Sequence, residues 1–175
     1  LKVKAYRYSL EWARIEPVKG KFDGAVLERY RNFTKSLLQS GIQPIITLNH
    51  FVLPQWFAKL GGWERRENLD YFKRFTETVV KELGGLVHFW ITVNEPNVYA
   101  SMSYLLGEWP PEVKDMERAR CVLKNLLFAH AMAYDSIKRV KPTSMVSIAL
   151  NVMPFLPSRR WHPGDCISSA FLGKL

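Results

Sequence analysis

The chain has 175 residues, of which 47% are hydrophobic and 23% charged, proportions typical of a globular protein with one sizeable core. These proportions exclude a disordered, collagen-like or coiled-coil chain, and no apolar run approaches the roughly 18 to 20 residues of a membrane span. Cys121 and Cys166 are far apart in the sequence and lack a CxxC partner. This spacing excludes a disulfide scaffold or a cysteine-based zinc site and favours a reducing compartment, the cytoplasm.

The net charge of +9 comes from 25 Lys and Arg against 16 Asp and Glu. Such an excess is compatible with an acidic partner. The basic residues are nevertheless spread along the whole chain, and no basic stripe with interleaved aromatic residues is present. We therefore expect neither nucleic acid nor a membrane as a partner, and a basic nucleic-acid-binding module remains a disfavoured alternative.

Four apolar segments alternate with amphipathic segments along the chain. The expected strands span residues 5–10, 42–48, 87–93 and 145–150. Helical spacing of apolar residues predicts helices between a cap at Asp23 and a stop at Gly41, over 68–83, and over 116–140. Because the chain starts at Leu1 rather than Met and opens almost directly into a strand, we expect a piece of a longer protein.

Strands that are apolar on both faces and are separated by crossover helices indicate an α/β fold with a parallel sheet. Two architectures fit: a doubly wound sheet, or four consecutive units of a (β/α)8 TIM barrel. The sequence lacks the GxGxxG and GxxxxGK[ST] turns of doubly wound nucleotide-binding folds. Polar residues follow each strand instead, as in a barrel that builds its site from separate loops. We therefore predict a partial TIM barrel, about half of one, as a single domain over 1–175.

Glu95 is the strongest candidate for a catalytic residue. It ends an aromatic and aliphatic strand, so desolvation of its carboxyl would favour the protonated form that a general acid requires. Asn94 beside it can donate a hydrogen bond to a polar ligand. On the local pattern alone, a strand-to-helix turn with Pro96 at the first helical position is the favoured alternative.

Three further residues are candidates for substrate binding. His50 follows an apolar strand and forms no HxH or HxxxH pair, so we expect no metal or cofactor and interpret it as a hydrogen-bond donor to a hydroxyl, against the alternative of a packed rim histidine. Arg7 stands within an apolar strand, where a guanidinium needs a carboxylate from Glu11, Glu16 or a distant part of a barrel. Trp109, and with it Trp12, is a candidate for stacking on a sugar ring.

Several linked motifs in this sequence resemble glycoside hydrolase family 1, the β-glucosidase and β-glycosidase family. They are, in chain order, YRYSLEWARIEP, GIQPIITLNHFVLPQWF followed by GGW, FWITVNEPNVY, LKNLLFAHAMAYDSIK and SIALN. The resemblance covers essentially the whole chain. Asn-Glu-Pro alone is not specific, since related retaining barrel families also end the fourth strand in Asn-Glu.

The resemblance implies a retaining double-displacement β-glycosidase acting on terminal β-linked sugars of O-glycosides or oligosaccharides. Glu95 occupies the acid/base position of the family, and His50 and Asn94 occupy sugar-binding positions. Arg7 matches the arginine that positions the nucleophile and keeps it ionised. The sequence differs from the family at Phe51, where the family commonly has Trp.

The resemblance also implies what these 175 residues lack. Only strands two to five of the family's barrel are represented, and the nucleophile Glu, in a later Thr-Glu-Asn-Gly-type motif, is absent from the sequence. We therefore expect the isolated chain to be inactive or nearly so. A half barrel also leaves two sheet edges unpaired, so we expect its partner to be the remainder of the barrel or another chain. Two other functions stay open: a retaining barrel enzyme such as an endo-β-glucanase, and a truncated, inactive sugar-binding relative.

Overall fold

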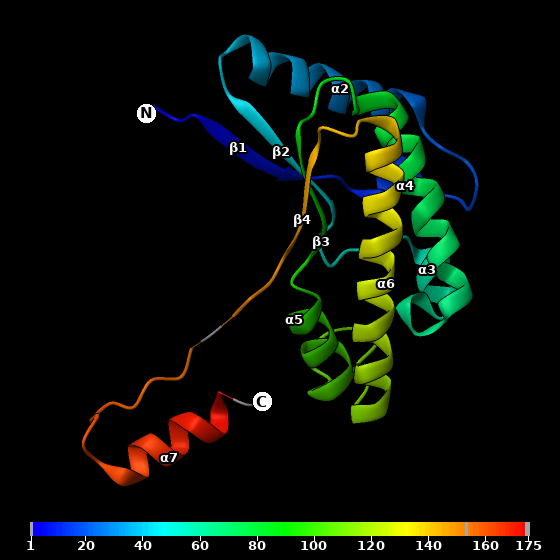
Figure 1. The fold of residues 1–175 in the computed structure, drawn as a ribbon. Coiled ribbons are helices and arrows are strands. Elements are labelled where there is room, and N and C mark those ends of the chain that lie inside the picture. Colours follow the sequence, from blue (N-terminus) through cyan, green and yellow to red (C-terminus); the bar gives the residue numbers. More distant parts are fainter. Residues whose placement is uncertain (1, 153, 174–175) are drawn as a thin grey trace.

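The computed structural model describes residues 2–152 and 154–173, and its centre is a four-stranded parallel sheet (Figure 1). The strands, in both chain and sheet order, are β1 (Ala5–Ser9), β2 (Gln43–Asn49), β3 (Phe89–Asn94) and β4 (Met145–Ala149). Each strand pairs with the next one along the chain, and Ile46 of β2 lies between Tyr8 of β1 and Trp90 of β3. The predicted parallel α/β arrangement is confirmed, and the strand order is that of consecutive barrel units.

Three long helices connect the strands: α2 (Gly24–Gln39), α4 (Leu69–Leu83) and α6 (Met116–Val140). Local caps fix where two of them begin. The Asp23 side chain accepts from the Val26 amide at 3.1 Å, and the Asp115 side chain accepts from the Glu117 and Arg118 amides. The shorter helices are α1 (Trp12–Ile15), α3 (Gln55–Lys59), η1 (Gly62–Glu64), η2 (Arg66–Asn68), α5 (Pro96–Ala100) and the π-helical turn η3 (Ser101–Leu105).

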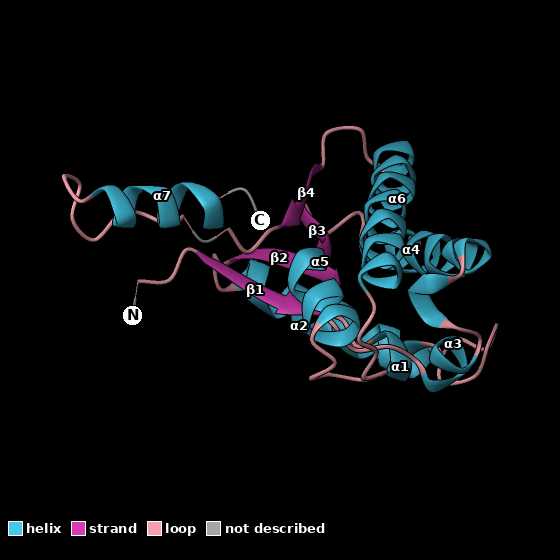
Figure 2. Ribbon diagram, turned by 90° about the horizontal axis from the view of Figure 1, so that it is seen from below, coloured by secondary structure: helices cyan, strands magenta, loops and turns pink. Residues whose placement is uncertain are grey.

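The hydrophobic core lies between one face of the sheet and the helices packed on it (Figure 2). Alternation along the strands determines this arrangement, because successive side chains point to opposite faces. Ile46 and Trp90 are at most 1% exposed and belong to the core, whereas Ile45 and Phe89 in the adjacent row are only partly buried. The second face of the sheet, which faces the inside of a barrel, is therefore less covered in this chain.

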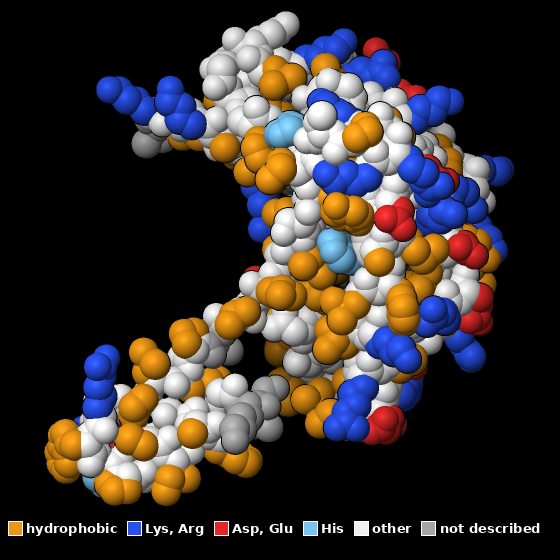
Figure 3. Space-filling model, in the orientation of Figure 1, with side chains coloured by type: hydrophobic (Ala, Val, Ile, Leu, Met, Phe, Trp, Pro, Cys, Tyr) orange, Lys and Arg blue, Asp and Glu red, His pale blue; other side chains and the backbone are white. Residues whose placement is uncertain are grey.

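An extended segment follows β4 and leads to α7 (Pro163–Leu172), which lies apart from the sheet and the long helices (Figure 1). The sequence did not predict this helix. Large apolar side chains are exposed along the segment and the helix, among them Val152, Leu156, Trp161, Ile167 and Phe171 (Figure 3). We call residues 150–172 the C-terminal arm. Within the ranges that the structure describes, neither α7 nor any other helix is long and apolar enough to cross a membrane.

Candidate active site

Polar side chains stand at the carboxyl ends of adjacent strands, which form one rim of the sheet. Ser9 ends β1, Asn49 ends β2 and is followed by His50, and Asn94 ends β3 and is followed by Glu95. Asn49 and Asn94 are each only 3% exposed. The structure therefore brings His50, Asn94 and Glu95, which the sequence singled out, to the same rim as Ser9 and Asn49.

Arg7 of β1 hydrogen-bonds to the neighbouring strand β2 and, beyond it, to β3. Its Nε donates to Thr47 Oγ1 at 2.9 Å and its Nη2 donates to Asn94 Oδ1. Because the Asn94 oxygen accepts from Arg7, the Asn94 Nδ2 group faces away from this bond and can donate to a ligand.

Neither local acid that the sequence offered as a partner for Arg7 is used. Glu16 bonds Arg74 instead, and no described acid forms an ion pair with Arg7. The guanidinium stays exposed on the less covered face of the sheet. Its charge is therefore free to serve a carboxylate brought to that face by another segment or chain.

His50 is held through one of its two ring nitrogens. The Ser9 Oγ lies 2.8 Å from His50 Nδ1, which leaves Nε2 free to contact a ligand. Partial burial and the positive charge of Arg7 lower the pKa of His50 from 6.5, whereas the charge of Glu95 acts in the opposite direction. The lowered pKa favours the neutral imidazole, and in the tautomer whose Nδ1 accepts from the Ser9 hydroxyl, Nε2–H can donate to a ligand hydroxyl.

Glu95 has an unusual backbone conformation for a residue with a side chain. Its φ of 43° and ψ of 59° lie in the left-handed region, which costs of the order of 1–3 kcal/mol. Its amide donates to the Ala149 carbonyl of β4 at 2.7 Å, and Pro96 starts α5 directly after it. The strand-to-helix turn that the sequence offered as an alternative is present, and it is the turn that places the half-buried Glu95 at the rim.

The two tryptophans singled out for stacking occupy different environments. Trp109 lies 5.0 Å, ring to ring, from Phe51, which in turn lies 5.0 Å from His50. Trp109 is thus one ring removed from the polar rim. The interpretation of Trp12 as a rim residue is wrong: it is 1% exposed, packs on Phe57 and Phe75, and donates from Nε1 to Glu16.

Ser9 and Thr47 are site residues that the sequence analysis missed. Ser9 ends β1 and Thr47 lies two residues before the end of β2, but their partners His50 and Arg7 are about 40 residues away in the sequence. A weak signal was available, since a hydroxyl in an apolar strand needs a partner. No three His, Cys, Asp or Glu residues gather as a metal site in the described ranges.

This arrangement suits chemistry on a hydroxylated ligand. A half-buried carboxyl can give or take a proton, while a neutral imidazole, an amide and a guanidinium beside it hydrogen-bond to hydroxyls or stabilise a second carboxylate. A single carboxyl supplies the acid or the base of such a reaction but not a separate nucleophile.

Comparisons with known proteins agree with this geometry. Residues 1–170 match the sequence model of glycosyl hydrolase family 1. The chain is 38% identical over 157 residues to β-glucosidase A of Acetivibrio thermocellus. The aligned region covers 89% of this chain and 35% of that protein. It is 36% identical over 151 residues to the human cytosolic β-glucosidase, covering 83% of this chain and 32% of that protein.

Solved structures extend the likeness to the fold. The β-glycosidase from Pyrococcus horikoshii superposes with a TM-score of 0.88 at 37% identity, over 98% of this chain and 39% of that chain. The chain therefore spans about a third of the length of these curated relatives and about two fifths of that solved structure. The predicted partial barrel is confirmed, with the four strands forming part of a TIM barrel.

Proposed function

The chain belongs to glycosyl hydrolase family 1, and from this premise we propose that the complete protein is a retaining β-glycosidase that removes terminal β-linked sugars from O-glycosides or oligosaccharides. The observation that carries the proposal is the set of Arg7, His50, Asn94 and Glu95 at one rim of a parallel sheet. The family match favours this enzyme over an endo-β-glucanase of another barrel family. We treat residues 1–175 as part of one barrel domain.

In the proposed mechanism Glu95 protonates the glycosidic oxygen as the bond to the leaving group breaks. In the second step the same carboxylate takes a proton from the water that hydrolyses the glycosyl-enzyme intermediate. His50 Nε2 and Asn94 Nδ2 hold sugar hydroxyls, since their other polar atoms are occupied by Ser9 and Arg7. Trp109 contributes an apolar surface near the leaving group, next to Phe51.

Arg7 has the position to orient a second carboxylate, the nucleophile, which these residues do not supply. Retention needs two carboxyls about 5 to 5.5 Å apart on opposite sides of the scissile bond. We therefore propose that the 175-residue chain alone does not turn over a glycoside. The missing carboxylate comes from the remainder of the barrel.

The same remainder of the barrel, or another chain in its place, is the proposed protein partner. The two outer strands, β1 and β4, each have one unpaired edge among the described residues. Tyr6 on β1 and Met145 on β4 are 47% and 57% exposed, and apolar side chains of the C-terminal arm are uncovered. Unpaired strand edges next to exposed apolar surface promote association. Size-exclusion chromatography of the isolated chain should show oligomers that dissociate only on dilution, and a sharp monomer peak at high concentration would contradict this.

We also propose that the protein works in the cytoplasm. Cys121 and Cys166 are free thiols, and Cys121 is exposed, so an oxidising compartment would subject it to disulfide exchange. Fractionation of the source cells tests this, and recovery of the protein outside the cytoplasm would contradict it.

A chimera tests the proposed function. Residues 1–175 replace the matching segment of the Acetivibrio thermocellus β-glucosidase A, so that the relative supplies the rest of the barrel. We expect the chimera to hydrolyse an aryl β-glucoside, Glu95→Gln to lower the rate about 10²- to 10⁴-fold, and the isolated chain to be inactive.

The matched control is Glu108→Gln, which removes an exposed acid from the loop before Trp109 and should leave the rate unchanged. A folded chimera without activity, or one in which Glu95→Gln and Glu108→Gln behave alike, would refute the proposed role of Glu95. Turnover by the isolated chain that depends on Glu95 would refute the need for a second segment.

A further inference from the structure

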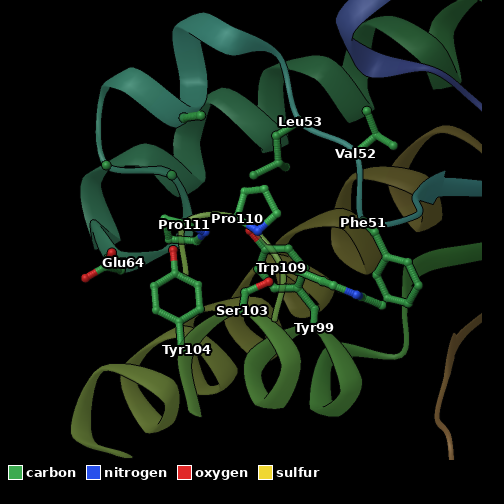
Figure 4. Close-up of a pocket in the computed structure, with 13 residues that line it drawn as sticks. Phe51, Val52, Leu53, Glu64, Tyr99, Ser103, Tyr104, Trp109, Pro110 and Pro111 are labelled. Atoms are coloured by element: carbon green, nitrogen blue, oxygen red, sulfur yellow. The ribbon is translucent and has the colours of Figure 1, made fainter. Parts of the chain in front are cut away.

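A pocket of about 390 Å³ lies beside the rim, on the far side of Phe51 (Figure 4). It is open to solvent on one side and bordered by the loop between β2 and α3, by α3 and η1, and by the segment from α5 to the loop that precedes α6. Its apolar walls are Phe51, Leu53, Tyr99, Trp109, Pro110 and Pro111. This volume is in the range of small-molecule sites, which are mostly apolar with a few polar groups.

Of the proposed substrate-binding residues, only Trp109 lines the pocket. Arg7, His50, Asn94 and Glu95 do not line it. The ring of Phe51 forms the partition, because it meets the His50 ring edge-on at 5.0 Å and also lines the pocket together with Trp109. Phe51 has a φ of 68°, a strained value for a residue with a side chain, and such strain concentrates at functional sites.

Ser103 supplies the unused polar group of the pocket. It is fully buried, lines the pocket, and has no hydrogen-bond partner for its Oγ within the described part of the chain. Figure 4 shows its hydroxyl among the rings of Tyr99, Tyr104 and Trp109. Ser103 belongs to the π-helical turn η3, a local geometry frequent at functional sites, and its carbonyl accepts from the Val113 amide. An unpaired buried hydroxyl favours a ligand that can hydrogen-bond to it.

The charge at the pocket is already neutralised. Glu64, at the end opposite Phe51 (Figure 4), accepts two hydrogen bonds from Arg118, at 2.7 and 2.8 Å. Its carboxylate is therefore satisfied and does not select a cationic ligand. The geometry points to a second small-molecule site that binds a neutral phenol of about two fused rings, with the rings between the aromatic walls and the hydroxyl paired with Ser103.

The probe is 6-fluoro-2-naphthol, followed by ¹⁹F NMR on the 175-residue chain and on the chimera, with 2-fluoronaphthalene as the ligand without a hydroxyl. Because residues 51–111 form all the pocket walls, we expect saturable binding to both proteins. Ser103→Ala should weaken binding of the naphthol about three- to tenfold, the value of one hydrogen bond, and leave binding of fluoronaphthalene unchanged.

Two pairs of variants locate the probe. Ala58→Phe, which places a ring on the α3 wall of the pocket, should abolish binding, whereas the matched control Lys59→Phe, on the same helix outside the pocket, should not. His50→Ala and Glu95→Gln should leave binding unchanged. Absence of saturable binding, an unaffected Ala58→Phe variant, loss of binding in His50→Ala, or binding to the isolated chain that disappears in the chimera would each overturn the proposal. None of these readouts depends on glycosidase activity.

Discussion

Glu16 is a fully buried carboxylate that hydrogen-bonds to three segments: α1, the loop after it, and α4. Its Oε2 accepts from Trp12 Nε1 at 2.9 Å, its Oε1 accepts from the Gly20 amide at 2.7 Å, and Arg74 of α4 pairs with Oε1. Its carbonyl also accepts from Trp56 Nε1 at 2.8 Å, which a side-chain substitution leaves in place. The perturbation of interest is therefore Glu16→Ala.

The two neutral donors lose a charged acceptor, a loss of about 1.5–3 kcal/mol for each hydrogen bond. We assign nothing to the Arg74 ion pair, because the Arg74 side chain is 38% exposed and solvent screens its charge. Removing the carboxylate also removes its own desolvation penalty, so we take the lower end of the sum, about 3 kcal/mol. That is a large part of the about 5–15 kcal/mol that stabilises a typical domain.

Urea unfolding of the dilute chain, followed by far-UV circular dichroism, measures this loss. With a slope of about 2 kcal/mol/M, the midpoint should fall by about 1.5 M in Glu16→Ala. The control Glu117→Ala removes a largely exposed acid, paired with Arg120 on the surface of α6, and should change stability by less than about 0.5 kcal/mol. If both variants lose less than about 1 kcal/mol, the buried network is not the stabilising element that we infer.

Other predictions concern the rim and the helix caps. NMR titration should give His50 a pKa below 6.5; Glu95→Gln should lower it further and Arg7→Met should raise it, and insensitivity to both would show that the three groups are not neighbours. Because the pKa of His50 is lower in the folded than in the unfolded chain, the unfolded chain binds the proton more tightly. The contribution of His50 to the free energy of unfolding should therefore fall as the pH drops below 6.5, and His50→Gln should remove this pH dependence. Asp115→Ala should destabilise the chain by about 1 kcal/mol in urea unfolding, through loss of the cap of α6, whereas Asp115→Asn should retain most of the stability.

The sequence predicted the elements whose limits depend on local signals. The helix expected over 116–140 is observed as Met116–Val140, because Asp115 caps one end and Pro142 follows the other. The strand expected over 42–48 is observed as Gln43–Asn49, a shift of one residue. The rim residues were also predictable, since parallel strands end at one edge and each polar residue directly follows an apolar run.

What the sequence could not predict depends on contacts between distant segments. Trp12 follows a strand, as a rim residue does, yet Phe57 and Phe75, more than 40 residues away, enclose its ring. The partners of Arg7 are likewise 40 and 87 residues distant. The π-helical geometry of η3 and the helix α7 were missed because neither has a strong apolar period in the sequence.

The central claim is that Glu95 is the acid/base group of a retaining glycosidase, and chemical rescue of Glu95→Ala in the chimera tests it most directly. A 2,4-dinitrophenyl β-glucoside needs little acid assistance to leave, so the glycosyl-enzyme forms and its hydrolysis becomes limiting without a general base. Azide, which needs no base, should then accelerate turnover and yield the β-glucosyl azide. No acceleration, or an azide product of inverted configuration, would contradict the assignment of Glu95.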